Sequence, residues 1–412
     1  MPHPPLLLLY PRWQDSQPWH RQQGAGLPED RGAPECDRHR CFVVNPAGDT
    51  YRSNWAQPPR PAKCSWRYDA VVGVHGQPGR LGHFSGLICC ASGFACPVCS
   101  AVIRAHKADD LQTALTVVES RPDLDLGLFL TLTIRHNGEP LANLLDTLLG
   151  AHRRMRSWSG WRTLESELGI VGTVRATEIT RRMGQDGTWH PHIHLWICTR
   201  TSPSKEQIEY ARTRIGEMWL LAVERQSEGL SVVPTAKHGV DLRRVTSNGV
   251  AAYVTKLQED GTHGQYRGLA SELVRADTKT GRARSSVVPF ELLDIPRQWR
   301  EYDAQVVGSG ERPPKPPCSI DEAKQLWQEF YRATKGKHIL TWSPGFRELL
   351  GLKRDKTEQQ IIDDTKSLEL LYEMDGKVYD KHRSNPIWLN EVLIDTEVEL
   401  DGNPRISWSE VW

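Results

Sequence analysis

Three histidines alternate along one short stretch of the sequence, HPHIH at residues 190–194, and an apolar run follows them. If this stretch is a β-strand, side chains at alternate positions point to one face, so His190, His192 and His194 share a face. Neutral imidazole is a common ligand of divalent metals. The spacing therefore predicts a metal site, and the competing interpretation is a surface strand that is merely rich in histidine.

A carboxylate on the preceding strand strengthens the metal interpretation. Glu178 lies in a strand pattern over residues 170–180, and residues 181–189 have the composition of a hairpin loop. Such a hairpin places Glu178 opposite the histidines, about 5 Å from its cross-strand neighbour. Imidazoles and one carboxylate leave coordination positions open for phosphate oxygens, and Mg²⁺ or Mn²⁺ with these mixed ligands suits phosphoryl transfer.

A second candidate is the pair Tyr253 and Lys256, which lie three residues apart in a predicted helix that opens at Asn248. On a helix, residues at this spacing are neighbours. A phenol, with a free pKa of about 10, is a poor nucleophile at neutral pH. A nearby metal and a lysine both favour the phenolate and the developing phosphorane charge. Without the histidines, an ordinary core tyrosine is the better interpretation.

Cysteines form the third signal, with Cys96 and Cys99 in a Cys-x-x-Cys pair, Cys90 just before it and Cys64 upstream. Cys-x-x-Cys places two thiolates to bind one tetrahedral Zn²⁺, and closing the longer loop back to Cys64 costs little extra entropy. The adjacent Cys89 is not expected to share this ion with Cys90. A redox role requires a strand–helix–strand context that the pattern does not show.

Basic and aromatic residues are interleaved near the end of the helix pattern over residues 141–158. Guanidinium groups suit phosphates and indoles suit unstacked bases, whereas the structural interpretation is a solvated helix end with favourable dipole charge. The candidate DNA-binding residues are Arg153, Arg154, Arg156, Arg175, Arg243 and Arg244.

Composition limits the classes of protein. The chain has 412 residues, of which 38% are hydrophobic and 25% charged, as in a soluble globular protein. Its net charge of +1 does not by itself indicate a nucleic-acid binder, so local clusters must supply any affinity for DNA. The sequence shows neither a signal peptide nor an apolar run of the roughly 20 residues that span a membrane. We therefore expect a cytoplasmic protein without a membrane partner.

Strand signals separated by helices, with a hairpin in the middle, predict an α+β fold. We expect a central antiparallel sheet of about five strands, flanked by helices, with an N-terminal zinc-binding segment and a C-terminal helical region. The predicted divisions are a low-complexity or disordered segment at residues 1–62, a cysteine-rich zinc segment at 63–100, a catalytic domain at 101–300, and a linker with a helical region at 301–412.

Taken in order, these pieces resemble a known family. The sequence is similar to the replication initiator (Rep) proteins of rolling-circle plasmids, within the HUH endonuclease superfamily. The segments that carry the resemblance are FLTLT at 129–133, VRATE at 174–178, WHPHIHL at 189–195, AYVTK at 252–256, CASGFACPVCS at 90–100, PFELL at 289–293 and GKHILTWS at 336–343. The resemblance covers roughly residues 64–352 and implies an HUH, ferredoxin-like fold.

The resemblance implies a site-specific DNA endonuclease and strand transferase. Tyr253 would attack single-stranded origin DNA and form a 5′-phosphotyrosine link, and Lys256 would position or polarise the phosphate or metal. His192 and His194 would hold the metal, with Glu178 or His190 as the third ligand. The free 3′ hydroxyl would prime a host DNA polymerase, working with a host helicase, and religation would end the round of replication.

The sequence departs from some relatives at Gly249, where they carry a glutamate that serves termination. The termination step is therefore open: another acid, another tyrosine, or Tyr253 of a second subunit are the alternatives, and the oligomeric state stays open as well. Three other functions remain: an HUH relaxase or transposase acting in conjugation or transposition, a non-catalytic zinc-containing DNA-binding protein, and an unrelated metal-dependent hydrolase.

Overall fold

The structure is a computed structural model, and the chain divides into two compact units. The described residues between 65 and 88 and between 369 and 382 form the smaller unit, and residue 64 with the described residues between 89 and 365 forms the larger one. The predicted zinc segment, residues 63–100, is thus divided between the two units. The residues that the structure describes are 64–66, 70–77, 80–184, 187–245, 286–305, 314–365 and 369–382.

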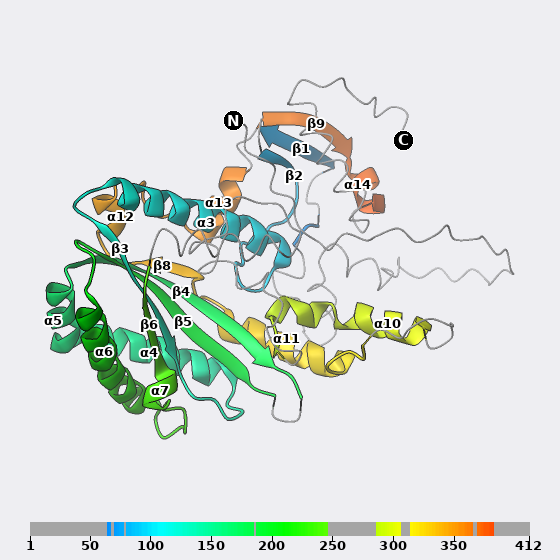
Figure 1. The fold of residues 1–412 in the computed structure, drawn as a ribbon. Coiled ribbons are helices and arrows are strands. Elements are labelled where there is room, and N and C mark those ends of the chain that lie inside the picture. Colours follow the sequence, from blue (N-terminus) through cyan, green and yellow to red (C-terminus); the bar gives the residue numbers. More distant parts are fainter. Residues whose placement is uncertain are drawn as a thin grey trace, which may run out of the picture. The chain divides into compact units, whose positions relative to one another are not determined.

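The larger unit is built on an antiparallel sheet (Figure 1). Its strands follow the order β6-β3-β5-β4-β7, and β8 pairs with β4 at the same edge as β7 but nearer the start of β4. The sheet is therefore five strands wide, which confirms the predicted α+β fold with a central antiparallel sheet flanked by helices. The strands are β3 (Asp125–Thr133), β4 (Ile170–Arg182), β5 (Trp189–Thr199), β6 (Val240–Arg244), β7 (Ser286–Val287) and β8 (Leu340–Trp342).

The two faces of this sheet have different coverings. In β3, Leu128, Leu130 and Leu132 are fully buried and alternate with Phe129 and Thr131, as expected for a strand whose residues alternate between faces. The leucine face packs against α4 (Leu141–Ser157), α5 (Ser159–Glu167) and α6 (Lys205–Gln226). Helix α3 (Pro97–Ser120) and α12 (Phe346–Leu349) pack on the other face (Figure 1).

Helix α3 covers only part of its face. Its buried side chains, among them Leu111 and Leu115, form one apolar cluster with Val174 and Trp196 of the sheet. Val174 and Trp196 are register partners, and they lie on the same face as residues 178 and 192, four positions farther along each strand. The apolar cluster thus supports one end of this face, and the histidines lie at the other end.

Local signals explain several helix bounds. Ser204 begins α6 with a capping box, in which its hydroxyl accepts from the Gln207 amide while the Gln207 side chain accepts from the Ser204 amide. Ser319 caps α11 (Ile320–Thr334), and its hydroxyl accepts from the Glu322 amide. Helix α3 begins with Pro97 in its first turn, and Cys96 is its N-cap residue.

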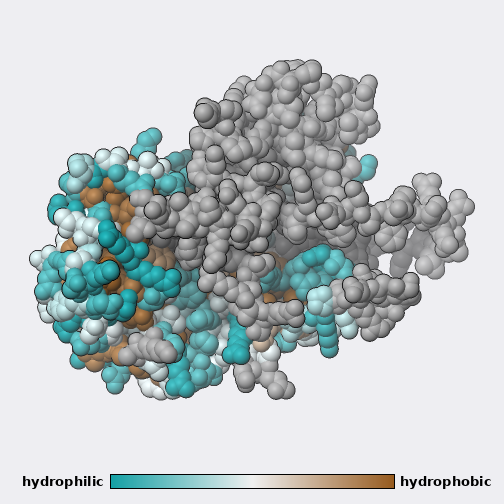
Figure 2. Space-filling view, in the orientation of Figure 1, coloured by the Kyte–Doolittle hydropathy of each residue, from teal (hydrophilic) through white to brown (hydrophobic). Residues whose placement is uncertain are grey.

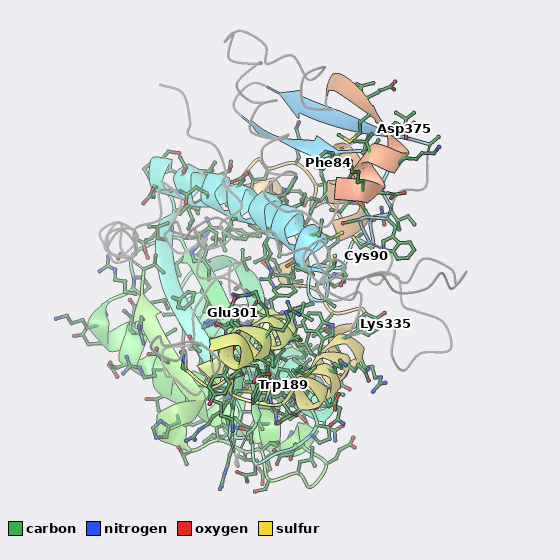
Figure 3. The ribbon with its side chains drawn as sticks, turned by 90° about the vertical axis from the view of Figure 1, so that its right-hand side faces the viewer. Phe84, Cys90, Trp189, Glu301, Lys335 and Asp375 are labelled. Carbon is green, nitrogen blue, oxygen red and sulfur yellow. The ribbon has the colours of Figure 1, made fainter. Side chains whose placement is uncertain are left out.

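Helix α11 also fixes the beginning of β5. The indole of Trp189 is 1% exposed and donates to Glu329 Oε2 at 2.9 Å. Its ring stacks on Phe330 with centroids 5.9 Å apart, and Figure 3 shows Trp189 among the side chains beside α11. The residue that immediately precedes the first histidine is therefore held by packing.

The smaller unit is a three-stranded antiparallel sheet in the order β2-β1-β9, with β1 (Val71–Gln77), β2 (Arg80–Phe84) and β9 (Glu369–Asp375). Tyr379 of α14 (Gly376–His382) is 1% exposed, and its hydroxyl donates to the Ser65 carbonyl. Residues 301–412 thus contribute strands as well as helices.

The remaining elements of the larger unit are short helices. They are α7 (Ala236–Gly239), η2 (Pro289–Leu293), α10 (Ile295–Gln305) and α13 (Glu358–Thr365).

The surface of the larger unit is polar on one side. Figure 2 shows that hydrophilic residues predominate on the side that carries α5 and α6. None of the helices in the described part of the chain is both long enough and apolar enough to cross a bilayer.

Candidate metal centre

Glu178, His192 and His194 converge on one point of the sheet. Glu178 is the register partner of His192 across β4 and β5, as the predicted hairpin requires. One carboxylate oxygen, Glu178 Oε2, lies 2.8 Å from Nε2 of His192 and 2.7 Å from Nε2 of His194. Because both nitrogens lie beside the same oxygen, the three side chains offer their ligand atoms to a common centre. We call these three residues the histidine group, and the sheet face that carries them the histidine face.

This group is held by strand β3 as well. Thr131 is the register partner of His194, and its Oγ1 lies 3.0 Å from His194 Nδ1. The ring of Phe129 stacks on the His194 ring, with centroids 5.3 Å apart and an interplanar angle of 19°. A hydrogen bond to Nδ1 fixes the ring orientation and leaves Nε2 directed at Glu178. Thr131 belongs to the FLTLT segment at 129–133, but the cross-strand pairing that gives it this contact is not visible in the sequence.

Burial makes the ionised Glu178 carboxylate energetically unfavourable unless a proton donor or a cation compensates its charge. Glu178 and His194 are each 7% exposed. His192 is partly buried, and its Nδ1 has no hydrogen-bond partner among the described residues. A buried carboxylate beside two imidazoles requires either protons on both Nε2 atoms or a cation that all three groups share.

The third predicted histidine, His190, lies beside the group but outside it. Its ring centroid is 5.3 Å from that of His192 and 4.7 Å from that of His136. Burial, followed by the charges of His192 and His136, lowers the pKa of His190 to about 4. Burial also lowers the pKa of His136, whose Nδ1 lies 2.7 Å from Thr188 Oγ1. His136 follows β3 as a lone histidine, and no motif in the sequence distinguishes it from other histidines.

Four thiols form a second cluster of possible metal ligands. Cys64, Cys90, Cys96 and Cys99 are buried, and their sulfur atoms lie within 4.8 Å of one another. Cys99 Sγ is 3.5 Å from Cys64 Sγ and 3.8 Å from Cys90 Sγ. Figure 3 shows Cys90 near the start of α3, where Cys96 accepts a hydrogen bond from the Cys99 amide. Cys89 does not belong to the cluster.

The thiols influence one another's ionisation. Hydrogen bonding with Cys64 is the main cause that lowers the pKa of the Cys99 thiol. The same partner is the main cause that raises the pKa of Cys90 and of Cys96, and burial raises both further. Hydrogen bonds from the neighbouring thiols thus stabilise the thiolate form of Cys99.

Comparison with known proteins assigns the chain to a family. A family model described as "Replication protein" matches residues 86–258. "Protein rep" of Streptomyces lividans is 31% identical over 328 residues, which is 68% of this chain and 67% of that protein. The chain belongs to the replication protein family. The family match includes the histidine group and three of the four clustered cysteines.

A second relative matches a shorter stretch of this replication protein. "Neomycin resistance protein" of Streptomyces cyanogenus is 28% identical over 137 residues, or 27% of this chain and 30% of that protein. No solved structure matches the chain.

The predicted DNA-binding arginines of this replication protein lie on both faces of the sheet. Arg243 pairs in register with Phe129 and so lies on the histidine face, where it is exposed and forms an ion pair with Asp241 at 2.5 Å. Arg244 is exposed and points to the opposite face of β6. Arg153, Arg154, Arg156 and Arg175 belong to α4 and β4.

The predicted nucleophile Tyr253, the adjacent Lys256 and Gly249 lie outside the described residues. All three fall within the segment matched by the family model, which ends at residue 258. Their roles rest on the sequence.

Proposed function

We propose that this protein initiates rolling-circle replication of a plasmid by nicking single-stranded DNA at the origin with Tyr253. The observation that carries the proposal is the position of Glu178 Oε2, which lies 2.8 Å from His192 Nε2 and 2.7 Å from His194 Nε2. Membership of the replication protein family and the order of the sequence motifs support the same reaction.

The donor set fits Mg²⁺ or Mn²⁺. In an octahedral site with ligand distances of about 2.1 Å, adjacent ligands stand about 3.0 Å apart. The observed separations of 2.8 and 2.7 Å are close to that value. Glu178, His192 and His194 would supply three ligands, and water and phosphate oxygens would supply the others. When bound, the ion supplies Lewis-acid polarisation of the scissile phosphate.

The hydroxyl of Thr131 is suited to orient His194 in the metal-bound protein. When Nε2 is a ligand, the proton of a neutral imidazole is on Nδ1, and Nδ1–H then donates to Thr131 Oγ1 at the observed 3.0 Å. The stacked ring of Phe129 limits rotation of the same imidazole.

The covalent step is a transesterification. Tyr253 loses its proton, and the phenolate oxygen forms a bond to the scissile phosphorus. The bond from phosphorus to the 3′ oxygen of the preceding nucleotide breaks, and that oxygen leaves as a free 3′ hydroxyl after taking up a proton. Lys256 stabilises the charge on the transferring phosphate. The 5′ end stays on Tyr253 as a phosphotyrosine ester.

The later steps use the two ends produced. The free 3′ hydroxyl primes a host DNA polymerase, and a host helicase unwinds the duplex ahead of it. At the end of the round, a 3′ hydroxyl attacks the phosphotyrosine ester and restores the phosphodiester bond. Gly249 cannot act as the acid of termination, so another group takes that role. Arg243, exposed on the histidine face, is suited to contact the incoming DNA strand.

We also propose a structural Zn²⁺ held by Cys64, Cys90, Cys96 and Cys99. A tetrahedral site with Zn–S distances of about 2.3 Å requires sulfur atoms about 3.8 Å apart. The two measured separations, 3.5 and 3.8 Å, match this requirement. Such an ion fastens the first turn of α3 and thereby the helix that covers part of the face carrying His192 and His194.

Covalent trapping tests the nicking reaction. Incubation of the full chain with single-stranded origin DNA and Mn²⁺ is expected to give a protein–DNA adduct that survives denaturation. Tyr253→Phe abolishes it, whereas Tyr210→Phe, which alters an exposed tyrosine of α6, does not. Binding without an adduct in the unaltered chain supports the non-catalytic zinc-containing DNA-binding protein. Turnover that survives Tyr253→Phe supports an unrelated metal-dependent hydrolase.

A replication assay separates the initiator from its HUH relatives. A plasmid that carries only this gene and its origin replicates if the protein is an initiator. It does not replicate if the protein is a relaxase or transposase of conjugation or transposition.

A further inference from the structure

We propose a second phosphate-binding site, formed by Arg153, Arg156 and Arg175 around His152, on the face of the sheet opposite the histidine group. Its ligand is a phosphate of the nucleic-acid backbone. The assignment to DNA rests on the proposed function, whereas the affinity for phosphate follows from the cluster itself. This site gives the protein a contact with DNA away from the nick.

The two sites lie on opposite faces because of strand geometry. Arg175 is the register partner of Leu195 on β5 and of Thr341 on β8. Glu178, an odd number of positions farther along β4, is the partner of His192. Alternate residues of a strand point to opposite faces, so Arg175 points to the face that α4 covers. One phosphate therefore cannot contact both sites.

Arg175 is a half-buried cation whose charge is not balanced by a carboxylate of the described residues. Its guanidinium donates to Thr341 Oγ1 at 3.1 Å. Its Nε is buried without a hydrogen-bond partner, and among the described residues no carboxylate forms an ion pair with it. Burial, together with Arg153 and Arg156, lowers the pKa of Arg175. Because an unpaired buried charge is costly, this arrangement favours an anion as the missing partner.

Arg156 is fixed beside the same end of β4. It donates to Thr173 Oγ1 at 2.9 Å, and Glu165 lies 3.3 Å away. Its guanidinium also lies over the ring of Trp161, 5.5 Å from the centroid. These contacts hold the side chain in one conformation, which reduces the entropy lost when an anion binds. Glu165 balances only one of the positive charges in the cluster.

His152 contributes a polar atom rather than a charge. It is 5% exposed, and its Nε2 has no hydrogen-bond partner among the described residues. Burial, followed by the charges of Arg175, Arg156 and Arg153, holds its pKa well below the ordinary value. The imidazole is therefore neutral at physiological pH, and the formal charge of the cluster, with Glu165 included, is positive.

Phosphate is the anion that fits this set of donors. Guanidinium groups bind phosphate oxygens through paired, charge-assisted hydrogen bonds. The hydroxyls of Thr173 and Thr341 already accept hydrogen bonds from the arginines, and their own protons are available to oxygen acceptors. Arg153 is exposed on α4 and can approach an anion from the solvent side.

The test begins with phosphate itself. Inorganic phosphate, compared with chloride at equal ionic strength, is expected to raise the melting temperature of the full chain. Arg175→Gln should abolish most of that rise. Arg214→Gln is the matched control, since it removes one positive charge from an exposed arginine of α6 that is paired with Glu217. If Arg175→Gln fails to fold, Arg153→Gln, which alters an exposed side chain, replaces it.

The second arm uses DNA and tests the identity of the ligand. The slope of log affinity for a 20-base-pair duplex against log salt concentration is expected to fall by about 0.9 in magnitude in Arg175→Gln, because one phosphate contact is lost. The control Arg214→Gln should keep the slope of the unaltered chain. These readouts do not depend on adduct formation, so the nicking reaction and this site can fail independently.

Two results overturn the proposal. An equal phosphate-dependent shift of the melting temperature in the unaltered chain, Arg175→Gln and Arg153→Gln shows that the cluster does not bind the anion. A phosphate effect that is lost in Arg175→Gln, combined with an unchanged salt slope on DNA, shows that the site binds an anion other than the nucleic-acid backbone.

Discussion

The four-cysteine cluster gives a sharp test of how α3 is held. The perturbation is removal of the proposed zinc, either by a chelator or by Cys99→Ser. Cys99 is the informative position, because its sulfur lies 3.5 Å from Cys64 Sγ and 3.8 Å from Cys90 Sγ, and its thiol is the one whose pKa is lowered.

The expected loss of folding stability is large. A structural zinc site contributes about 10–16 kcal/mol of binding free energy at neutral pH, and the net stability of a domain is about 5–15 kcal/mol. The cluster fastens the start of a helix of 24 residues, and Leu111, Leu115 and Val118 of that helix belong to the apolar core of the sheet. Loss of the ion therefore removes support from the core as well as from the cysteine loop, and we expect loss of cooperative folding near 37 °C.

The assay combines metal content with thermal unfolding. The purified chain is expected to contain one zinc per molecule, and Cys99→Ser should contain none. Cys198→Ser is the matched control, because Cys198 is a buried cysteine of the same core that lies outside the cluster and hydrogen-bonds to the Asp125 carbonyl. A serine can keep that hydrogen bond. Zinc-free protein with an undiminished melting temperature, or equal destabilisation by the two substitutions, would refute the reasoning.

Three further predictions follow from single contacts. Thr131→Val should weaken Mn²⁺ binding by about 10- to 100-fold, because His194 loses its orienting hydrogen bond, while Thr131→Ser should retain the affinity in a calorimetric titration. Since the pKa of His152 is held well below its ordinary value, the unfolded chain takes up a proton that the folded chain does not, and folding should lose about 1 kcal/mol between pH 6.5 and 5.5. In urea unfolding, His152→Gln should remove that part of the pH dependence of the unfolding free energy. An unchanged dependence of the unfolding free energy on pH in this variant would contradict the prediction. Gly172→Ala should lower the unfolding free energy by about 1–3 kcal/mol in urea unfolding, because the added Cβ meets the Phe346 ring at 2.1 Å. An unchanged unfolding free energy would show that the Phe346 ring moves aside without cost.

The central strands could be predicted because their signals are local. Alternation of leucine with phenylalanine and threonine marks β3, and the loop between β4 and β5 fixed the register that brings Glu178 opposite His192. Helix α11 begins at a serine cap and buries one apolar face, and both features are local in the sequence. In each case the residues that decide the structure lie within one turn or one hairpin of each other.

Other features could not be predicted, because they depend on pairing between distant segments. Strand β8 pairs with β4 across more than 160 residues, which brings Thr341 to Arg175. Strands β1 and β9 lie nearly 300 residues apart in the sequence. The contact of Thr131 with His194 depends on the register between β3 and β5, which no turn specifies. Hydrophobic periodicity reports which face of a strand is buried, but it does not identify the neighbouring strand.

The candidate site was therefore predicted in part. The residue types and spacing of Glu178, His192 and His194 predicted their proximity, because one hairpin joins them. The four cysteines were predicted from a Cys-x-x-Cys pair and two further thiols, and the structure brings all four sulfur atoms together. The pairing of Arg175 with Thr341 was not predicted. The approach of Tyr253 to the histidines stays a prediction.

Pulsed electron paramagnetic resonance of bound Mn²⁺ tests the metal centre most directly. The predicted spectrum shows one high-affinity Mn²⁺ per chain with hyperfine coupling to the nitrogens of two imidazoles. His192→Ala or His194→Ala should remove one coupling and weaken binding, whereas His238→Ala, at an exposed histidine, should change neither. Bound Mn²⁺ without histidine nitrogen coupling, or affinity unchanged in both site variants, would contradict the assignment of this group as the metal site.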